Sequence, residues 1–186
     1  MAENPDRDGR RGFVKKGLLG GALLLLAGAV PIALRSGPMS ARPRRPLLLL
    51  SPEEYAVFAA VAARIVPGDG AGTAWPTAEA VDCAGKTDQL MARAHPKAGA
   101  EFRQLLHLFE NGLTGLLTHL RPTPFTACTP AQQDARLSAW SRSRIALLRS
   151  GYQALKRLTQ ATYYSSPELY PHIGYPGPPE VPSLPG

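Results

Sequence analysis

The sequence has few of the features that mark the common classes of enzyme. It contains only two cysteines, so it has neither a pair of C-x-x-C metal ligands nor a C-x-x-C-H haem attachment motif. No G-x-G-x-x-G follows a strand-like segment, which argues against a dinucleotide-binding fold. Paired carboxylates and Ser/His arrangements of the kind that carry catalysis are also missing. The sequence therefore predicts no catalytic residue, no metal ligand and no cofactor held by this chain.

The sequence also lacks the alternating valine- and isoleucine-rich segments that predict β-strands. It contains two helix-start signals, at Ser51 and Thr129. In each, a capping hydroxyl is followed by a first-turn proline and by a Glu or Gln three positions after the cap. Apolar residues at three- and four-residue spacing follow both starts. These patterns predict an all-α fold, a small bundle of four or five helices. We expect helices over 51–66, 76–94, 97–120 and 129–162, the last with a break near 141–143.

The mature part of the chain has almost no net charge. Residues 1–46 carry nine Lys and Arg against three Asp and Glu, whereas residues 47–186 carry twelve against eleven. The overall charge of +7 therefore comes almost entirely from the N-terminal segment. A nearly neutral mature domain without a cluster of basic and aromatic residues argues against nucleic-acid binding.

The basic N-terminal segment has the pattern of an export signal. Arg10 and Arg11 are followed by Phe13 and Lys15, as in a twin-arginine motif, and an uncharged apolar segment extends from Gly17 to Leu34. Residues 1–35 are therefore interpreted as a signal read by the twin-arginine translocase, with the basic end inside. Small residues at 27–29 allow cleavage, but retention as a membrane anchor is left open. Residues 36–50 are interpreted as a Pro/Arg linker.

The end of the chain differs in composition from the bundle expected over residues 51–162. Residues 163–186 are rich in proline and tyrosine, a combination that suits docking in an extended conformation along a groove of another protein. Docking of this tail onto its own bundle is an equal alternative. Truncation after Thr162 is expected to leave the bundle folded. The predicted partner-interface residues are Tyr163, Tyr164, Ser165, Ser166, Pro167, Tyr170, Ile173, Gly174, Tyr175, Pro176, Gly177 and Pro178.

The histidines and cysteines support only weak hypotheses. His107 and His119 are twelve residues apart on one expected helix, which places them about 120° apart around its axis, so they cannot form a two-histidine metal site. An enzyme that uses a histidine as an acid or base has no further support in the sequence. Cys83 and Cys128 either form a disulfide in an oxidising compartment or remain separate small buried side chains.

The chain resembles the gluconate 2-dehydrogenase subunit 3 family, the small subunits of membrane-associated flavin-dependent dehydrogenases. The resemblance covers nearly the whole chain. The segments that carry it are Arg10-Arg11, the helix from Leu50-Ser51-Pro52-Glu53-Glu54 to Ile65-Val66-Pro67, the Trp140-containing helix pair, and the closing Tyr163-Tyr164-Ser165-Ser166-Pro167 and Ile173-Gly174-Tyr175-Pro176-Gly177-Pro178.

This resemblance implies a non-catalytic subunit of a larger complex. The partner would be a large subunit of the glucose-methanol-choline type that binds FAD and oxidises a sugar, a sugar acid or an alcohol. A cytochrome c subunit with haem c commonly takes the electrons. The small subunit would stabilise the flavoprotein, escort it through twin-arginine export and remain with it in the periplasm, bound to or facing the inner membrane. A stand-alone exported, membrane-anchored helical binding protein is the alternative.

Overall fold

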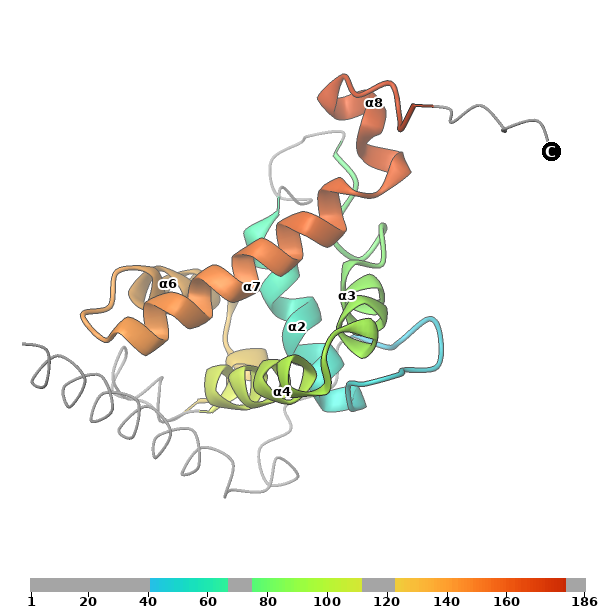
Figure 1. The fold of residues 1–186 in the computed structure, drawn as a ribbon. Helices are drawn as coiled ribbons and strands as arrows, with labels where there is room; N and C mark the ends of the chain where they lie inside the picture. The colour runs from blue at the N-terminus through green and yellow to red at the C-terminus, as the bar shows by residue number, and fades with distance from the viewer. Residues whose placement is uncertain (1–40, 67–74, 112–122, 180–186) are drawn as a thin grey trace, which may run out of the picture.

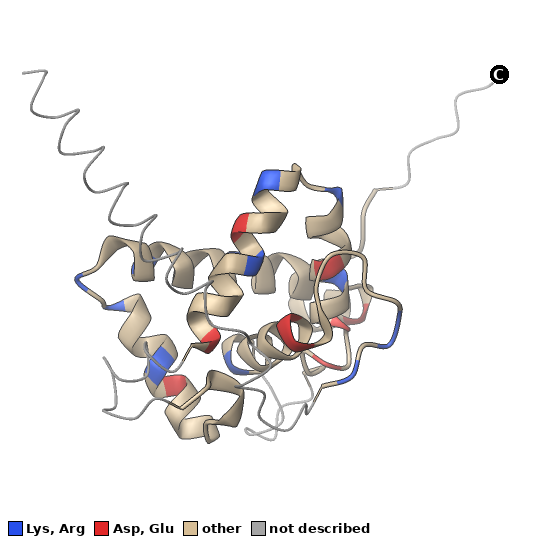
Figure 2. Cartoon of the chain, turned by 90° about the horizontal axis from the view of Figure 1, so that it is seen from below, with Lys and Arg blue, Asp and Glu red and all other residues tan. Residues whose placement is uncertain are grey.

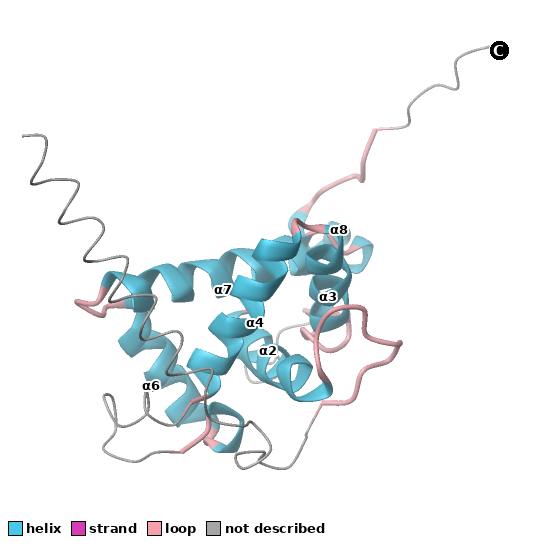
Figure 3. Cartoon of the chain, turned by 60° about the horizontal axis from the view of Figure 1, so that its bottom comes forward, coloured by secondary structure: helices cyan, strands magenta, loops and turns pink. Residues whose placement is uncertain are grey.

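The computed structural model describes residues 41–66, 75–111 and 123–179 (Figure 1). These residues form helices joined by loops, and no strand occurs among them (Figure 3). The predicted all-α fold is therefore confirmed, whereas the leader lies outside the described residues. In chain order the helices are α2 (Pro52–Ile65), α3 (Cys83–Arg93), α4 (Pro96–Glu110), the 3-10 helix η2 (Phe125–Ala127), α6 (Pro130–Ser141), α7 (Ala146–Tyr164), the 3-10 helix η3 (Pro167–Leu169) and α8 (Tyr170–Ile173).

Both predicted helix starts are confirmed. The Ser51 hydroxyl accepts a hydrogen bond from the Glu54 N–H at 3.2 Å, and the Glu54 carboxylate accepts one from the Ser51 N–H at 2.8 Å. The Thr129 hydroxyl and the Gln132 side chain make the same reciprocal pair at the start of α6. These capping boxes satisfy N–H groups that have no partner inside the helix.

The second and third predicted helices are shorter than expected. The segment before α3 is a turn, because Asp82 has a φ of 51° and its left-handed conformation interrupts helical geometry. Gly85 leaves room for the Asp82 side chain, since a Cβ at this position would lie 2.5 Å from the Asp82 carboxylate and would displace it. Helix α4 ends at Glu110, and Asn111 has an extended ψ of 126°. The expected helix over 97–120 is therefore wrong as one continuous element.

The fourth prediction is confirmed, since α6 ends at Ser141 and α7 begins at Ala146. Helix α7 runs diagonally across the molecule, with α6 beside its first half and α2 and α3 beside the rest (Figure 1). Aromatic side chains fill the centre: the Phe109 ring lies 4.6 Å from those of Phe125 and Trp140. All three side chains are almost completely buried. Burial of such large apolar surfaces is the main stabilising term of the bundle.

The C-terminal segment is helical over much of the region expected to be extended. Helix α7 continues to Tyr164, and Pro167 occupies the first position of η3, where its missing N–H costs nothing. Tyr163, Ser166 and Leu169 are completely buried in the bundle. The chain becomes irregular only after Gly174, which ends α8 with a φ of 65°. Truncation after Thr162 would remove these core residues, so we now expect it to destabilise the bundle rather than to leave it intact.

The end of the expected linker belongs to the bundle. The Asp88 carboxylate on α3 accepts hydrogen bonds from the N–H groups of Leu48, Leu49 and Leu50 at 2.7, 2.9 and 2.8 Å. Both Asp88 and Leu50 are buried. Residues 48–50 are thus held against α3 by one carboxylate, which fixes where the linker enters the bundle.

Candidate partner-docking surface

The predicted interface residues form one end of the molecule, next to residues 75–86. The Tyr163 hydroxyl donates a hydrogen bond to the Pro76 carbonyl at 2.6 Å. The Lys86 ammonium donates one to the Ser166 hydroxyl at 2.7 Å. The His172 ring lies 5.5 Å from that of Trp75. These contacts hold the C-terminal segment against the region before α3 and thereby fix the position of α8.

Within this segment the side chains divide into a buried and an exposed set. Tyr163 and Ser166 are buried and therefore serve the bundle itself. Tyr170 packs edge-on against Tyr175 at 4.9 Å, and the Tyr175 N–H donates to the Tyr170 carbonyl. Gly177 is half-buried, with a φ of 104°. The remaining predicted residues are exposed, namely Tyr164, Ser165, Pro167, Ile173, Gly174, Tyr175, Pro176 and Pro178.

Three large apolar side chains in this set are directed to solvent. Tyr164, Ile173 and Tyr175 are 38%, 42% and 42% exposed. We call these three residues, together with the Trp75 and His172 pair, the C-terminal surface. Tyrosine next to proline gives large contact area with little side-chain freedom to lose, which favours protein binding. The sequence pattern predicted Tyr164, Ile173 and Tyr175 as interface residues, whereas Trp75 and His172 were added only by the structure.

A second cluster joins the start of α2 to the C-terminal half of α4. The Glu54 carboxylate accepts hydrogen bonds from Arg103 Nε at 2.9 Å and makes a 2.6 Å hydrogen bond with His107 Nε2. Burial raises the Glu54 pKa, but the bonds from His107, the Ser51 N–H and Arg103 outweigh this effect, so the pKa is lowered. All of these hydrogen bonds stabilise the ionised form of the Glu54 side chain, so the cluster has a structural role. The sequence indicated only the capping role of Glu54.

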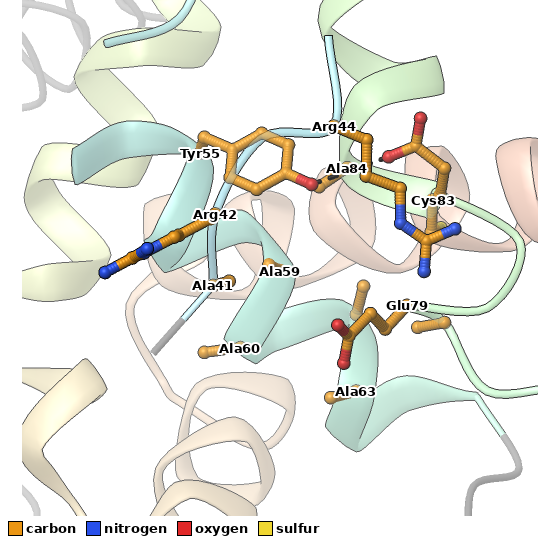
Figure 4. Close-up of a pocket in the computed structure, with 13 residues that line it drawn as sticks. Ala41, Arg42, Arg44, Tyr55, Ala59, Ala60, Ala63, Glu79, Cys83 and Ala84 are labelled. Carbon is orange, nitrogen blue, oxygen red and sulfur yellow. Dashed lines mark hydrogen bonds between the residues drawn. The ribbon is translucent and has the colours of Figure 1, made fainter. Parts of the chain in front are cut away.

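A shallow cavity of about 210 Å³ lies between residues 41–44, α2 and the start of α3 (Figure 4). Alanines of α2 form its floor, and Figure 4 shows Arg44, Tyr55 and Glu79 at its rim. Burial and the neighbouring Asp82 carboxylate raise the Tyr55 pKa. The Tyr55 hydroxyl is therefore held neutral and is a poor base.

The two cysteines are free thiols with separate surroundings. Cys83 is buried beside Thr162, whose hydroxyl oxygen is 3.0 Å from its sulfur, and burial raises its pKa. The Cys128 thiol donates to the Pro124 carbonyl at 3.3 Å and lies 3.5 Å from a guanidinium nitrogen of Arg136. A disulfide between Cys83 and Cys128 is therefore not formed in this structure.

The described residues contain no group of three or more His, Cys, Asp or Glu side chains that could hold a metal ion. Within the same residues, none of the helices has the length and apolar character needed to cross a bilayer. The signal residues Arg10, Arg11, Phe13 and Lys15 lie outside the part of the chain that the structure describes. Among the described residues, the C-terminal surface is therefore the candidate functional site.

The fold and this surface define a small all-α bundle that presents an aromatic, proline-rich end to solvent. In a comparison with known families, the chain matches the model of gluconate 2-dehydrogenase subunit 3 over residues 52–177. The chain belongs to this family, which is named for a subunit of a multi-subunit dehydrogenase. Searches of curated proteins and of solved structures found no match.

Proposed function

We propose that this chain is the non-catalytic small subunit of a FAD-dependent dehydrogenase of the glucose-methanol-choline type. It binds the flavoprotein in the cytoplasm, carries it through the twin-arginine translocase and stabilises it in the periplasm at the inner membrane. FAD belongs to the large subunit, which oxidises a sugar, a sugar acid or an alcohol. A cytochrome c subunit with haem c receives the electrons.

The C-terminal surface is the observation that carries this proposal. It lies at the far end of α7 and exposes Tyr164, Ile173 and Tyr175, while the neighbouring Tyr163 and Leu169 anchor the segment in the core. Such anchoring keeps the exposed side chains in fixed positions before binding, which lowers the entropic cost of association. Together with the family membership, this supports a rigid docking site for the large subunit.

Paired substitutions test the docking site. The double substitution Ile173→Ser and Tyr175→Ser should weaken the complex with the flavoprotein by at least about a hundredfold, because central aromatic and aliphatic anchors dominate interfaces. Leu48→Ser with Leu90→Ser is the matched control, since these side chains are also large, apolar and exposed. Size exclusion with the co-expressed flavoprotein is the measurement. Equal complex formation by both double variants would refute docking through this surface.

The escort role has its own test. Replacing Arg10 and Arg11 by lysine should keep the flavoprotein in the cytoplasm, although the complex still forms. FAD fluorescence and dehydrogenase activity of the periplasmic fraction measure the outcome. Normal periplasmic activity with the Lys-Lys leader would contradict escort. A chain that is exported but purifies without any flavoprotein would instead support the stand-alone binding protein.

A further inference from the structure

The basic residues of the mature chain are concentrated in one hairpin. Residues 135–167, which include most of α6 and all of α7, contain six Arg and Lys and no Asp or Glu. The nearest acidic side chain before this segment, Asp134, is paired with Arg64 at 2.7 Å. Figure 2 shows basic and no acidic positions at the turn between the two helices. The near-neutral total of the mature chain therefore conceals a strongly polarised charge distribution.

Three of these arginines surround the turn between α6 and α7. Arg142, Arg144 and Arg149 are all exposed. Arg149 Nη1 donates to the Ser143 carbonyl at 2.6 Å, and Arg142 donates to the Ser138 hydroxyl, so both guanidinium groups bond to serines in or beside the turn. Arg144 has no hydrogen-bond or ion-pair partner among the described residues. No carboxylate neutralises any of the three within the part of the chain described.

The same turn exposes a large apolar side chain. Ile145 lies between the arginines and is 47% exposed. The turn is the outer end of the hairpin and projects from one end of the molecule (Figure 1). Basic residues around an apolar tip match the headgroup layer of a bilayer, where the cations meet phosphates and the apolar group enters the acyl boundary. A single exposed isoleucine among three arginines is small for the apolar core of a protein interface, so the turn is better matched by an anionic lipid surface than by an acidic protein.

We propose that this turn, formed by Arg142, Arg144, Ile145 and Arg149, binds the anionic surface of a phospholipid bilayer. The guanidinium groups contact phosphodiester headgroups, and Ile145 enters the layer between them. The binding goes beyond the proposed subunit role, because it requires only lipid and this chain. Its failure would leave the docking of a flavoprotein at the C-terminal surface untouched.

The test uses the full chain reconstituted into vesicles, so that the leader is the same in every sample. An environment-sensitive fluorophore is attached at Ala146→Cys, next to the turn, or at Ala92→Cys on α3 as a control, both with Cys128→Ser. Vesicles consist of phosphatidylcholine alone or with about one third phosphatidylglycerol. We expect a blue shift at position 146, only with phosphatidylglycerol, that about 0.5 M NaCl abolishes. Position 92 should not respond.

Charge variants identify the residues responsible. Each arginine near an anionic surface strengthens binding about fivefold, so Arg142→Gln, Arg144→Gln and Arg149→Gln together should abolish the shift at position 146. The triple variant Arg45→Gln, Arg93→Gln and Lys97→Gln removes the same charge from other exposed sites and should keep the shift. Equal shifts at positions 146 and 92, a shift in phosphatidylcholine alone, or equal effects of both triple variants would each overturn the proposal. The proposal would also be overturned if the variant with Arg142, Arg144 and Arg149 replaced by glutamine lost the copurifying flavoprotein but kept the lipid response.

Discussion

At the scale of single residues, two buried glutamates have opposite surroundings. Hydrogen bonds to Glu54 lower its pKa below the ordinary value of 4.5 despite burial. Burial raises the pKa of Glu110, and the bonds from Thr126 only partly offset it. Folding therefore favours the charged form of Glu54 and the neutral form of Glu110. The two side chains should give the stability of the bundle opposite dependences on pH.

The signs follow from linkage. The stability that Glu54 contributes is present above pH 4.5 and is lost as the pH falls through its lowered pKa. The stability that neutral Glu110 contributes is present below pH 4.5 and is lost as the pH rises through its raised pKa. Glu54→Gln should therefore lower the free energy of unfolding by about 2 kcal/mol at neutral pH but less in acid. Glu110→Gln, in contrast, should lower the free energy of unfolding less at neutral pH than in acid. Urea unfolding between about pH 2 and pH 7 measures both, and parallel profiles for the two variants would contradict the assignment.

Asp88 joins residues 48–50 of the linker to α3. Asp88→Asn should lower the free energy of unfolding by about 2 kcal/mol, because an amide presents only one acceptor oxygen to the three N–H groups of Leu48, Leu49 and Leu50. Asp134→Asn is the control, since its exposed ion pair with Arg64 should contribute less than about 1 kcal/mol. Chemical denaturation compares the two; equal losses would show that the backbone contacts contribute no more than the surface pair.

The roles of these residues could be predicted only in part from the sequence. The capping role of Glu54 is local, because Ser51 and Glu54 are three positions apart, so the pattern was sufficient. Arg103 and His107 reach Glu54 from α4, about fifty positions further along the chain, and Asp88 reaches back to the linker. Such partners depend on how the helices pack, and no spacing rule encodes them.

At the scale of elements, the end of a helix was predictable where the types of the neighbouring residues determine it. The break before α7 follows from the serines at 141 and 143. The turn before α3 depends on the left-handed conformation of Asp82, which the neighbouring residue types do not predict. The tail was interpreted as extended because of its prolines. Pro167 and Pro171 instead occupy first turns of short helices, since the buried Leu169 anchors the segment.

Helix α7 depends on one glycine for its packing. A Cβ at Gly151 would lie 2.8 Å from Leu105 Cδ1 and 2.9 Å from the buried Trp140 ring. Gly151→Ala should therefore lower the free energy of unfolding by about 1 to 2 kcal/mol, although alanine favours helices. Ser150→Ala, at the exposed neighbouring position, should be neutral or stabilising. Thermal unfolding checks the pair, and a stabilised Gly151→Ala variant would show that Leu105 and Trp140 can move aside.

At the scale of the whole molecule, α7 separates two surfaces. Its 19 residues span about 28 Å, with the basic turn at one end and the C-terminal surface at the other. On both proposals, one end faces the bilayer and the other holds the flavoprotein. The small subunit would then act as a spacer that sets the distance of the flavin enzyme from the membrane.

This arrangement predicts that the two surfaces fail independently. In cells that express the complete complex, the turn variant with Arg142, Arg144 and Arg149 replaced by glutamine should shift the exported flavoprotein from the membrane fraction toward the soluble periplasmic fraction, with the two chains still associated. The Ile173→Ser and Tyr175→Ser variant should do the reverse, leaving the small subunit on the membrane without its partner. Fractionation with activity and immunoblot readouts separates these outcomes. Loss of both properties in either variant would mean that the ends are coupled through the bundle, because an independent spacer transmits no change from one end to the other.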